Sequence, residues 1–226
     1  MMRSAMSMLE LIFAIVIMGI AVMSLPLILT QVQTNNAFAL QQEAILAAKT
    51  KIGDILTYEW DDNSYDVTAQ RSFVLYTTNG DPELDCNATT NRRIGHINAD
   101  YRRKCSVTGA TTSAIGDIGA DGGDLDDIDD FNGQATTITA TLEGAGTLDY
   151  VFTALTLTPT ITYASDTATY SNTPLNNFTF NPNNANVRTN IKTIAVTASG
   201  GNQNITLRTF SCNIGESSLL PSRPYL

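Results

Sequence analysis

Aspartates crowd one stretch of this 226-residue chain, with seven in fourteen residues and no basic residue among them. They are Asp117, Asp121, Asp124, Asp126, Asp127, Asp129 and Asp130. Because neighbouring carboxylates repel one another, a hard divalent cation would relieve the repulsion, and calcium takes oxygen ligands of this kind. The Asp-rich stretch (117–130) therefore predicts one candidate cofactor, calcium, with the ligands Asp124, Asp126, Asp127, Asp129 and Asp130. The stretch does not match an EF-hand loop, so a solvated acidic loop that binds no ion is the simpler alternative.

Basic residues gather just before this stretch, where five of the thirteen Lys and Arg residues fall within thirteen positions. Together with the single histidine, this basic cluster comprises Arg92, Arg93, His96, Arg102, Arg103 and Lys104. Such a cluster can bind DNA, a glycan or an acidic neighbour, although a solvated loop that pairs with the Asp-rich stretch is simpler. The net charge of the whole chain is −9, which opposes binding to a phosphate backbone. We therefore expect no nucleic-acid partner.

Three cysteines, Cys86, Cys105 and Cys212, leave the disulfide pairing open, because three pairings are possible with one thiol left over. We favour Cys86 with Cys105, which bracket eighteen residues and would stabilise the fold by about 3 kcal/mol if the head is exported. The alternatives are that all three stay reduced, or that Cys212 is simply a buried strand residue. With no Cys-x-x-Cys spacing and one histidine, a structural zinc site is not expected.

No arrangement of residues in the chain predicts catalysis. Nucleophile elbows, phosphate-binding loops and zinc-protease motifs are missing from the sequence. Carboxylate pairs occur in the Asp-rich stretch, but a flexible acidic loop has no means of setting two pKa values apart. We expect a protein that is not an enzyme and that has no cofactor other than the calcium considered above.

An apolar segment near the N-terminus decides where the rest of the chain must lie. No residue in 11–29 carries a charge, and this length of helix measures about 28 Å, close to the hydrocarbon thickness of a bilayer. Glu10 stands at its start, where desolvation of a carboxylate is costly, so a partner or a function is expected. A secretory signal peptide is the ordinary alternative, and Arg3 fits it, but the apolar run is too long and lacks a small-residue cleavage site.

Ala5-Met6-Ser7-Met8-Leu9-Glu10 combines a small residue, an apolar residue after it and a glutamate that is fifth when Met6 is counted as the first. This motif resembles the class III leader junction of type IV pilins and type II secretion pseudopilins, in which a glutamate is fifth in the mature chain. Gly19 and Pro26 fall near positions where the family carries glycine and proline. The chain departs from the pattern at Ala5, where glycine is usual, and at Met6, where phenylalanine is usual.

The resemblance implies processing followed by assembly. Prepilin peptidase would remove the leader 1–5 after Ala5 and methylate the new amine of Met6, and Glu10 would pair with the N-terminal amine of a neighbouring pilin subunit. The chain would cross the inner membrane once with its head in the periplasm, and then enter a filament in the periplasm or at the cell surface. The length of the head favours a minor subunit. Whether the filament serves secretion, adhesion, motility or DNA uptake stays open.

Two other functions compete with this one. A periplasmic binding or adhesin domain on a single uncleaved anchor would keep the whole N-terminus. A secreted calcium-binding protein would lose the apolar helix altogether. Both lack a role for an acid at Glu10.

The elements that carry these residues follow from hydrophobic periodicity. The apolar segment and the amphipathic sequence after it predict one helix over 6–60, bent or weakened at Pro26, with its membrane half at 11–29. The face predicted to pack on the head consists of Phe38, Ile45, Ala48, Ile52 and Ile55. Trp60 is expected to be a packing anchor between helix and head.

The remainder, 61–226, is predicted to form a β-rich head. Alternation and β-branched residues predict strands at 71–78, 134–142, 150–163, 190–198 and 204–212. Residues 199–203 have hairpin length, and Pro159 is expected to split its strand or to mark a sheet edge. The predicted fold class is α+β, with the long helix laid on an antiparallel sheet.

Overall fold

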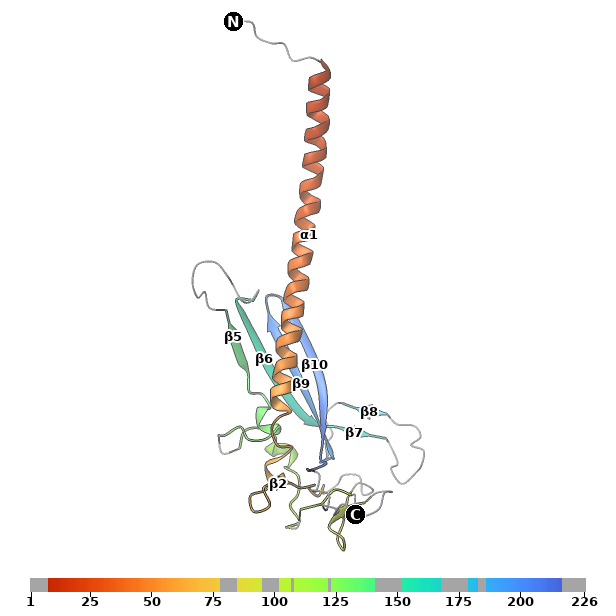
Figure 1. Ribbon diagram of the computed structural model, residues 1–226, viewed down its shortest axis with the longest axis vertical. Helices are drawn as coiled ribbons and strands as arrows, with labels where there is room; N and C mark the ends of the chain where they lie inside the picture. The colour runs from red at the N-terminus through yellow and green to blue at the C-terminus, as the bar shows by residue number, and fades with distance from the viewer. Residues whose placement is uncertain are drawn as a thin grey trace, which may run out of the picture.

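The computed structural model confirms the α+β architecture of a long N-terminal helix packed on an antiparallel sheet. It describes residues 8–77, 85–94, 102–106, 108–121, 123–140, 152–167, 179–182 and 186–216. Helix α1 (Met8–Ile55) runs for 48 residues, and Figure 1 shows its first half projecting far beyond the head. We call residues 8–37 the stalk and residues 38–55 the base of α1.

Helix α1 continues through Pro26 without interruption. Proline removes one N–H donor from the helix, yet Figure 1 shows no sharp kink there, so the predicted bend is at most slight. The helix ends at Ile55, earlier than predicted, and turns follow in which Thr57 N donates to Asp54 O and Tyr58 N to Ile55 O. Beyond them Glu59 forms an isolated bridge with Asp127, so the chain has already joined the head.

The main sheet has four antiparallel strands in the order β10-β9-β6-β5. Their bounds are β5 (Thr136–Thr139), β6 (Ala154–Tyr163), β9 (Ile191–Gly200) and β10 (Gln203–Cys212). The hairpin between β9 and β10 is tighter than predicted, because Gly200 pairs with Gln203. Only Gly201 and Asn202 turn the chain, and both have positive φ, which is the backbone of a two-residue hairpin loop.

Pro159 does not split its strand. It lies in the middle of β6 and is paired with Val196 of β9. Its carbonyl accepts from Gly133 N at 3.0 Å, on the side of β5, and its missing N–H belongs to that side too. Strand β5 has ended its pairing at Thr136, opposite Leu157, so β6 is an edge where the proline sits.

The segment predicted as a strand over 71–78 is not part of this sheet. It forms β2 (Arg71–Ser72), and then isolated parallel bridges join Val74 to Cys105 and Tyr76 to Thr111. The described part of the chain also contains short pairs, β1 (Tyr65–Asp66) with β2, β3 (Cys86–Asn87) with β4 (Arg92–Arg93), and β7 (Ser165–Asp166) with β8 (Phe180–Asn181). Single turns of 3-10 helix are η1 (Asp62–Ser64), η4 (Ile115–Asp117) and η5 (Asp129–Phe131).

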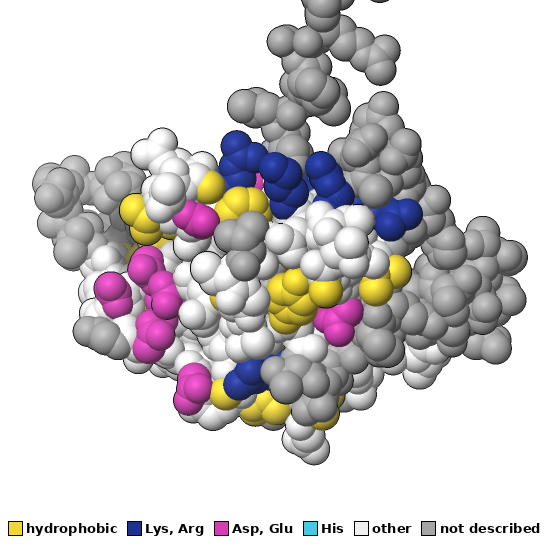
Figure 2. Space-filling model, turned by 90° about the horizontal axis from the view of Figure 1, so that it is seen from below, with side chains coloured by type: hydrophobic (Ala, Val, Ile, Leu, Met, Phe, Trp, Pro, Cys, Tyr) yellow, Lys and Arg dark blue, Asp and Glu magenta, His cyan; other side chains and the backbone are white. Residues whose placement is uncertain are grey.

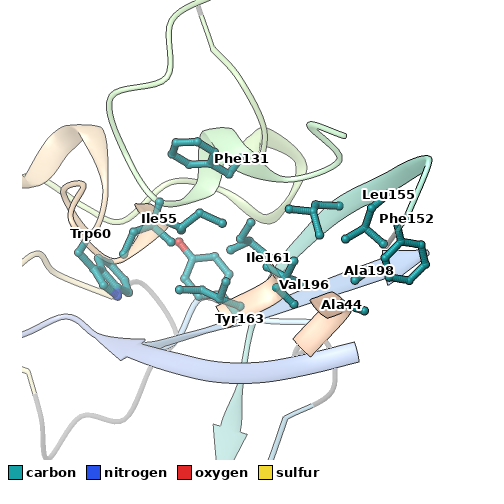
Figure 3. Packing of buried hydrophobic residues seen from close by; sticks show 14 of the residues in the cluster. Ala44, Ile55, Trp60, Phe131, Phe152, Leu155, Ile161, Tyr163, Val196 and Ala198 are labelled. Carbon is teal, nitrogen blue, oxygen red and sulfur yellow. The ribbon is translucent and has the colours of Figure 1, made fainter. Parts of the chain in front are cut away.

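The core lies between the base of α1 and one face of the sheet (Figure 3). On the helix, Ala44, Ala48 and Ile55 are buried, and small side chains at 44 and 48 let the helix backbone approach the strands. The predicted packing face was partly wrong, because Phe38 is 59% exposed and Ile45 is 40% exposed. The sheet contributes inward side chains from β6 and β9, namely Leu155, Leu157, Ile161, Tyr163, Ile194, Val196 and Ala198.

Trp60 is buried where α1 meets the head, as predicted. Its ring lies 6.4 Å from that of Tyr163, on β6. Nearby, Phe131 of η5 packs edge-on against Tyr58 at 4.8 Å, and the Lys51 ammonium lies 4.6 Å from the Phe131 ring. These aromatic contacts fix the end of the helix to the loop that carries the Asp-rich stretch.

Candidate assembly surface

The stalk exposes an apolar surface all round. Every large apolar side chain from Met8 to Val32 is at least 49% exposed. Soluble monomers rarely expose contiguous apolar patches larger than a few hundred Å², so this surface must be covered by lipid or by another chain. By length and composition α1 can cross a membrane, which makes it a candidate membrane anchor.

Polar side chains mark the end of the apolar surface. The Thr30 hydroxyl donates to Pro26 O at 2.8 Å, the Thr34 hydroxyl donates to Thr30 O at 2.9 Å, and Gln31 Nε2 donates to Asn35 Oδ1 at 3.1 Å. These bonds satisfy polar groups within the helix itself. They place the change from an apolar to an aqueous environment a few turns before the head begins.

Gly19 and Pro26 both lie within the stalk. A Cβ added at Gly19 would meet no atom within 4 Å, so nothing in this chain requires glycine there. Glycine in a helix interior costs about 1 kcal/mol relative to alanine. The presence of glycine at this position fits a close approach by a second helix. Pro26 lies inside the same helix, where it removes one backbone N–H donor.

Glu10 lies in the first turn of α1, where an acid interacts favourably with the helix dipole, and its side chain is exposed. Ala5 and Met6, at the predicted cleavage site, lie outside the described residues. Glu10 thus lies at the end of α1 that is far from the head, since the helix begins at Met8 and its base packs on the sheet.

The head is held to the helix by a buried charged centre. The Lys192 ammonium, on the inner face of β9, donates to Trp60 O at 2.7 Å, to Asp61 Oδ2 at 3.0 Å and to Asp129 Oδ1. It also lies 4.3 Å from the centre of the Trp60 ring. Lys192 and Asp61 are fully buried, so this centre joins the segment after α1, the Asp-rich stretch and the sheet in a place shielded from bulk solvent.

Three of the seven aspartates in the Asp-rich stretch are not solvated, unlike the acidic loop given as the simpler alternative. Asp127, Asp129 and Asp130 are buried, whereas Asp124 and Asp126 are exposed. Their carboxylates act mainly as acceptors for backbone N–H groups, which is how buried carboxylates are satisfied in proteins.

Two of these carboxylates cap neighbouring backbone. Asp127 accepts from the N–H groups of Asp62, Asp129 and Asp130 at 2.6 to 3.1 Å. Asp130 accepts from those of Asp126 and Asp127 at 2.9 and 3.2 Å. In the described part of the chain no group of three or more His, Cys, Asp or Glu side chains could hold a metal ion, so the geometry gives the calcium hypothesis no support.

Burial changes the acidity of this centre. It raises the pKa of Asp127 to about 8, with further contributions from the nearby charge of Asp129 and from a hydrogen bond between the two carboxyl groups. Burial also raises the pKa of Asp129, an effect that the Lys192 ammonium opposes. A shared hydrogen bond between two carboxyls requires a proton on one of them, so the pair holds a proton at neutral pH.

Cys86 and Cys105 form the predicted disulfide, with their Cα atoms 6.1 Å apart. It ties β3 to the segment that pairs with Val74. Cys212 is a half-buried thiol at the end of β10, and burial raises its pKa. The disulfide is consistent with a head that folds outside the cytoplasm.

Among the described residues, no ion pair joins the basic cluster to the Asp-rich stretch. Where the structure describes both partners, the ion pair from that stretch goes to Lys192. Arg93 instead donates to Asn190 Oδ1 at 2.6 Å, and its burial lowers its pKa to about 10. Arg92 donates to Arg102 O at 2.7 Å and Arg103 to Gly215 O at 3.3 Å. Figure 2 shows basic side chains gathered along one side of the end of the head and acidic ones elsewhere; His96 lies outside the described residues.

An apolar groove of about 470 Å³ runs between the base of α1 and the β5 side of the sheet. Its walls include Leu46, Ala47, Ile138, Phe152 and Leu155. It exists because α1 contacts β6, β9 and β10 and leaves β5 uncovered.

Comparisons with protein-family models, with curated proteins and with solved structures found no match to this chain.

Proposed function

We propose that this chain is a pilin-like structural subunit, of the minor kind, in a type IV filament or a type II secretion pseudopilus. The observation that carries the proposal is the stalk: an apolar helix exposed all round, continuous with a helix that is built into a folded head. A helix of this kind can lie in a bilayer before assembly and against other apolar helices after it.

Glu10 and Gly19 give the proposal its detail. Gly19 provides room for a neighbouring helix that this chain itself does not fill. A charged Glu10 is costly within a bilayer. The methylated amine of Met6 on a neighbouring subunit would provide a cation that offsets this cost. Apolar packing would then drive association, while the charge pair would set the axial register.

In this proposal prepilin peptidase removes residues 1–5 and methylates Met6. The processed chain, which begins at Met6, crosses the inner membrane once with its head in the periplasm. From there it passes into the filament. The disulfide supports an oxidising location for the head. A single-pass anchored binding or adhesin domain is the second candidate, and the membrane-length helix supports it equally.

Substitution of Glu10 separates the two candidates. We expect Glu10→Val to leave the chain in the membrane but to reduce strongly its amount in sheared or purified filaments, because the charge pair with the neighbouring amine is lost. The matched control is Asp54→Asn, which removes an exposed acid of the same helix that pairs with Lys51. Unchanged incorporation of Glu10→Val would rule out the register role, and absence of the unmodified chain from filaments would favour the anchored domain.

A further inference from the structure

The buried centre around Lys192 brings one ammonium into contact with two carboxyl groups inside the core. Three hydrogen bonds use all the donors of the ammonium, and two of them end on carboxylates, Asp61 and Asp129. All three side chains are almost fully buried, with exposures of 0%, 0% and 4%. An amine and a carboxyl group are thus held in contact in a place from which water is excluded.

Aromatic rings form the walls of this centre. The Lys192 ammonium lies 4.3 Å from the centre of the Trp60 ring and 5.8 Å from that of Tyr163. Figure 3 shows both rings in the core beside Ile55. Low polarity disfavours the charged forms of an amine and an acid relative to their neutral forms. Condensation of the pair would remove two buried charges and release one water.

The two carboxyl groups differ in their hydrogen bonds. Asp61 accepts from Asn63 N, from Asn63 Nδ2 and from Ser113 N, at 2.9 to 3.3 Å, as well as from Lys192, so both of its oxygens are held in place. In the described part of the chain the Asp129 carboxyl accepts from Lys192 through Oδ1, and no backbone N–H donates to it. Asp129 is therefore the carboxyl with an oxygen that no backbone donor holds and that can leave, and Asp61 lies beside the same nitrogen, where it can transfer protons.

We propose that Lys192 and Asp129 condense to an intramolecular amide bond, an isopeptide crosslink, with Asp61 as the proton carrier. The inference does not depend on the proposed filament function.

The reaction balances without a co-reactant. The Lys192 ammonium gives one proton to the Asp129 carboxylate, which leaves a neutral amine and a neutral acid. The amine lone pair attacks Cγ of Asp129, and a C–N bond forms. Asp61 takes a second proton from the nitrogen and delivers it to the departing hydroxyl, so a C–O bond breaks and water leaves. The products are one amide and one water, Asp61 ends as the carboxylate, and nothing is oxidised or reduced.

The crosslink would join η5 to β9 next to the end of α1, across 63 residues of sequence. Lys192 also donates to Trp60 O, in the segment that follows the end of α1 at Ile55. A force that pulled the helix away from the sheet would then act on a covalent bond as well as on packed side chains.

The test is the mass of the full-length chain, extracted in detergent, reduced and denatured. We expect the unmodified protein to be lighter than its processed sequence by one water. A tryptic digest should contain a branched peptide that joins segment 105–188, which holds Asp129, to segment 189–208, which holds Lys192. A chain at its full mass would overturn the proposal.

Variants distinguish the crosslink from other reactions that lose one water, such as cyclisation of the aspartate at Asp121-Gly122. Lys192→Arg should restore the full mass, and a persistent loss in this variant would overturn the proposal. Asp129→Asn should give the same final product, now by loss of ammonia, and Asp61→Asn should abolish or greatly slow the reaction. A branched peptide that contained segment 52–71 would make Asp61 the electrophile and would overturn the assigned roles.

Discussion

The stalk and the base of α1 belong to one helix, but their side chains have different surroundings. In the stalk, large apolar side chains cover every face and are exposed. In the base, Ala44 and Ala48 are fully buried against the sheet, while polar side chains face water. The difference shows that the base contacts the sheet through Ala44, Ala48 and Ile55, whereas the large apolar side chains of the stalk stay exposed.

The largest expected effect separates two isoleucines of the same helix. Ile55→Ala in the base should lower the free energy of unfolding of the head by about 2 to 5 kcal/mol, because it leaves a cavity in the core. Ile17→Ala in the stalk should leave it unchanged, since Ile17 is exposed. Denaturant unfolding in detergent, followed by the fluorescence of Trp60, measures both. Equal effects would mean that the stalk also packs on the head.

A second pair of variants tests the close approach of the helix to the sheet. Ala48→Leu should destabilise the head by about 1 to 3 kcal/mol, because the added side chain overpacks the contact with the strands. Ala37→Leu, at an exposed position just before the base, is the control and should change stability very little. A neutral Ala48→Leu would show that the helix can move away from the sheet at no cost.

Stability should also depend on pH through the centre that follows the base. The pKa of Asp127 is about 8 in the folded chain and near 4 in an unfolded one, so the folded state binds the proton more tightly. The stabilisation is complete below about pH 4 and is lost as the pH rises through 8. We expect the thermal midpoint to fall by several degrees over this range.

Asp127→Asn is the variant for this prediction, and the quantity compared is the slope of stability against pH. The slope should become smaller without reaching zero, because burial and the nearby charge of Asp121 also raise the pKa of Asp62. A slope that did not change would place the pH dependence elsewhere in the head.

The smallest effect on stability and a clear effect on assembly are expected at Gly19. Gly19→Leu should leave the thermal midpoint of the head unchanged, since a side chain there meets open space in this chain. It should lower incorporation into filaments, because a bulky side chain prevents close approach of a second helix. Gly53→Ala, at an exposed position of the base with equally open space, is the control. Normal assembly of Gly19→Leu would remove the argument from this glycine.

Periodicity predicted the long helix and the strands of the main sheet, because both depend on local alternation of apolar and polar residues. Periodicity wrongly placed Phe38 and Ile45 on the face of the helix that contacts the sheet. Where the helix lies closest to the strands, the buried residues are the small Ala44 and Ala48. The strand predicted over 71–78 was wrong in extent, because after β2 the residues Val74 and Tyr76 pair singly with distant segments.

The buried centre could not be predicted from the Asp-rich stretch alone. A run of acids indicates solvent unless a distant residue supplies the compensating charge, and Lys192 is 63 residues away from Asp129. A signal did exist in the sequence. Lys192, Ile194 and Val196 are spaced two residues apart on one strand, so their side chains share a face and Lys192 should point inward with the two apolar residues. A lysine on the buried face of a strand requires an acid, and the Asp-rich stretch contains the most acids.

The N-terminal residue of the mature chain tests the proposed function most directly. The measurement is N-terminal sequencing together with intact mass of the protein from its own membranes. Our account predicts a chain that begins at N-methyl-Met6 and retains the apolar helix with Glu10. A chain that still began at Met1 or Met2 would contradict it in favour of an anchored domain, and one that began beyond Leu29 would contradict it in favour of a secreted protein.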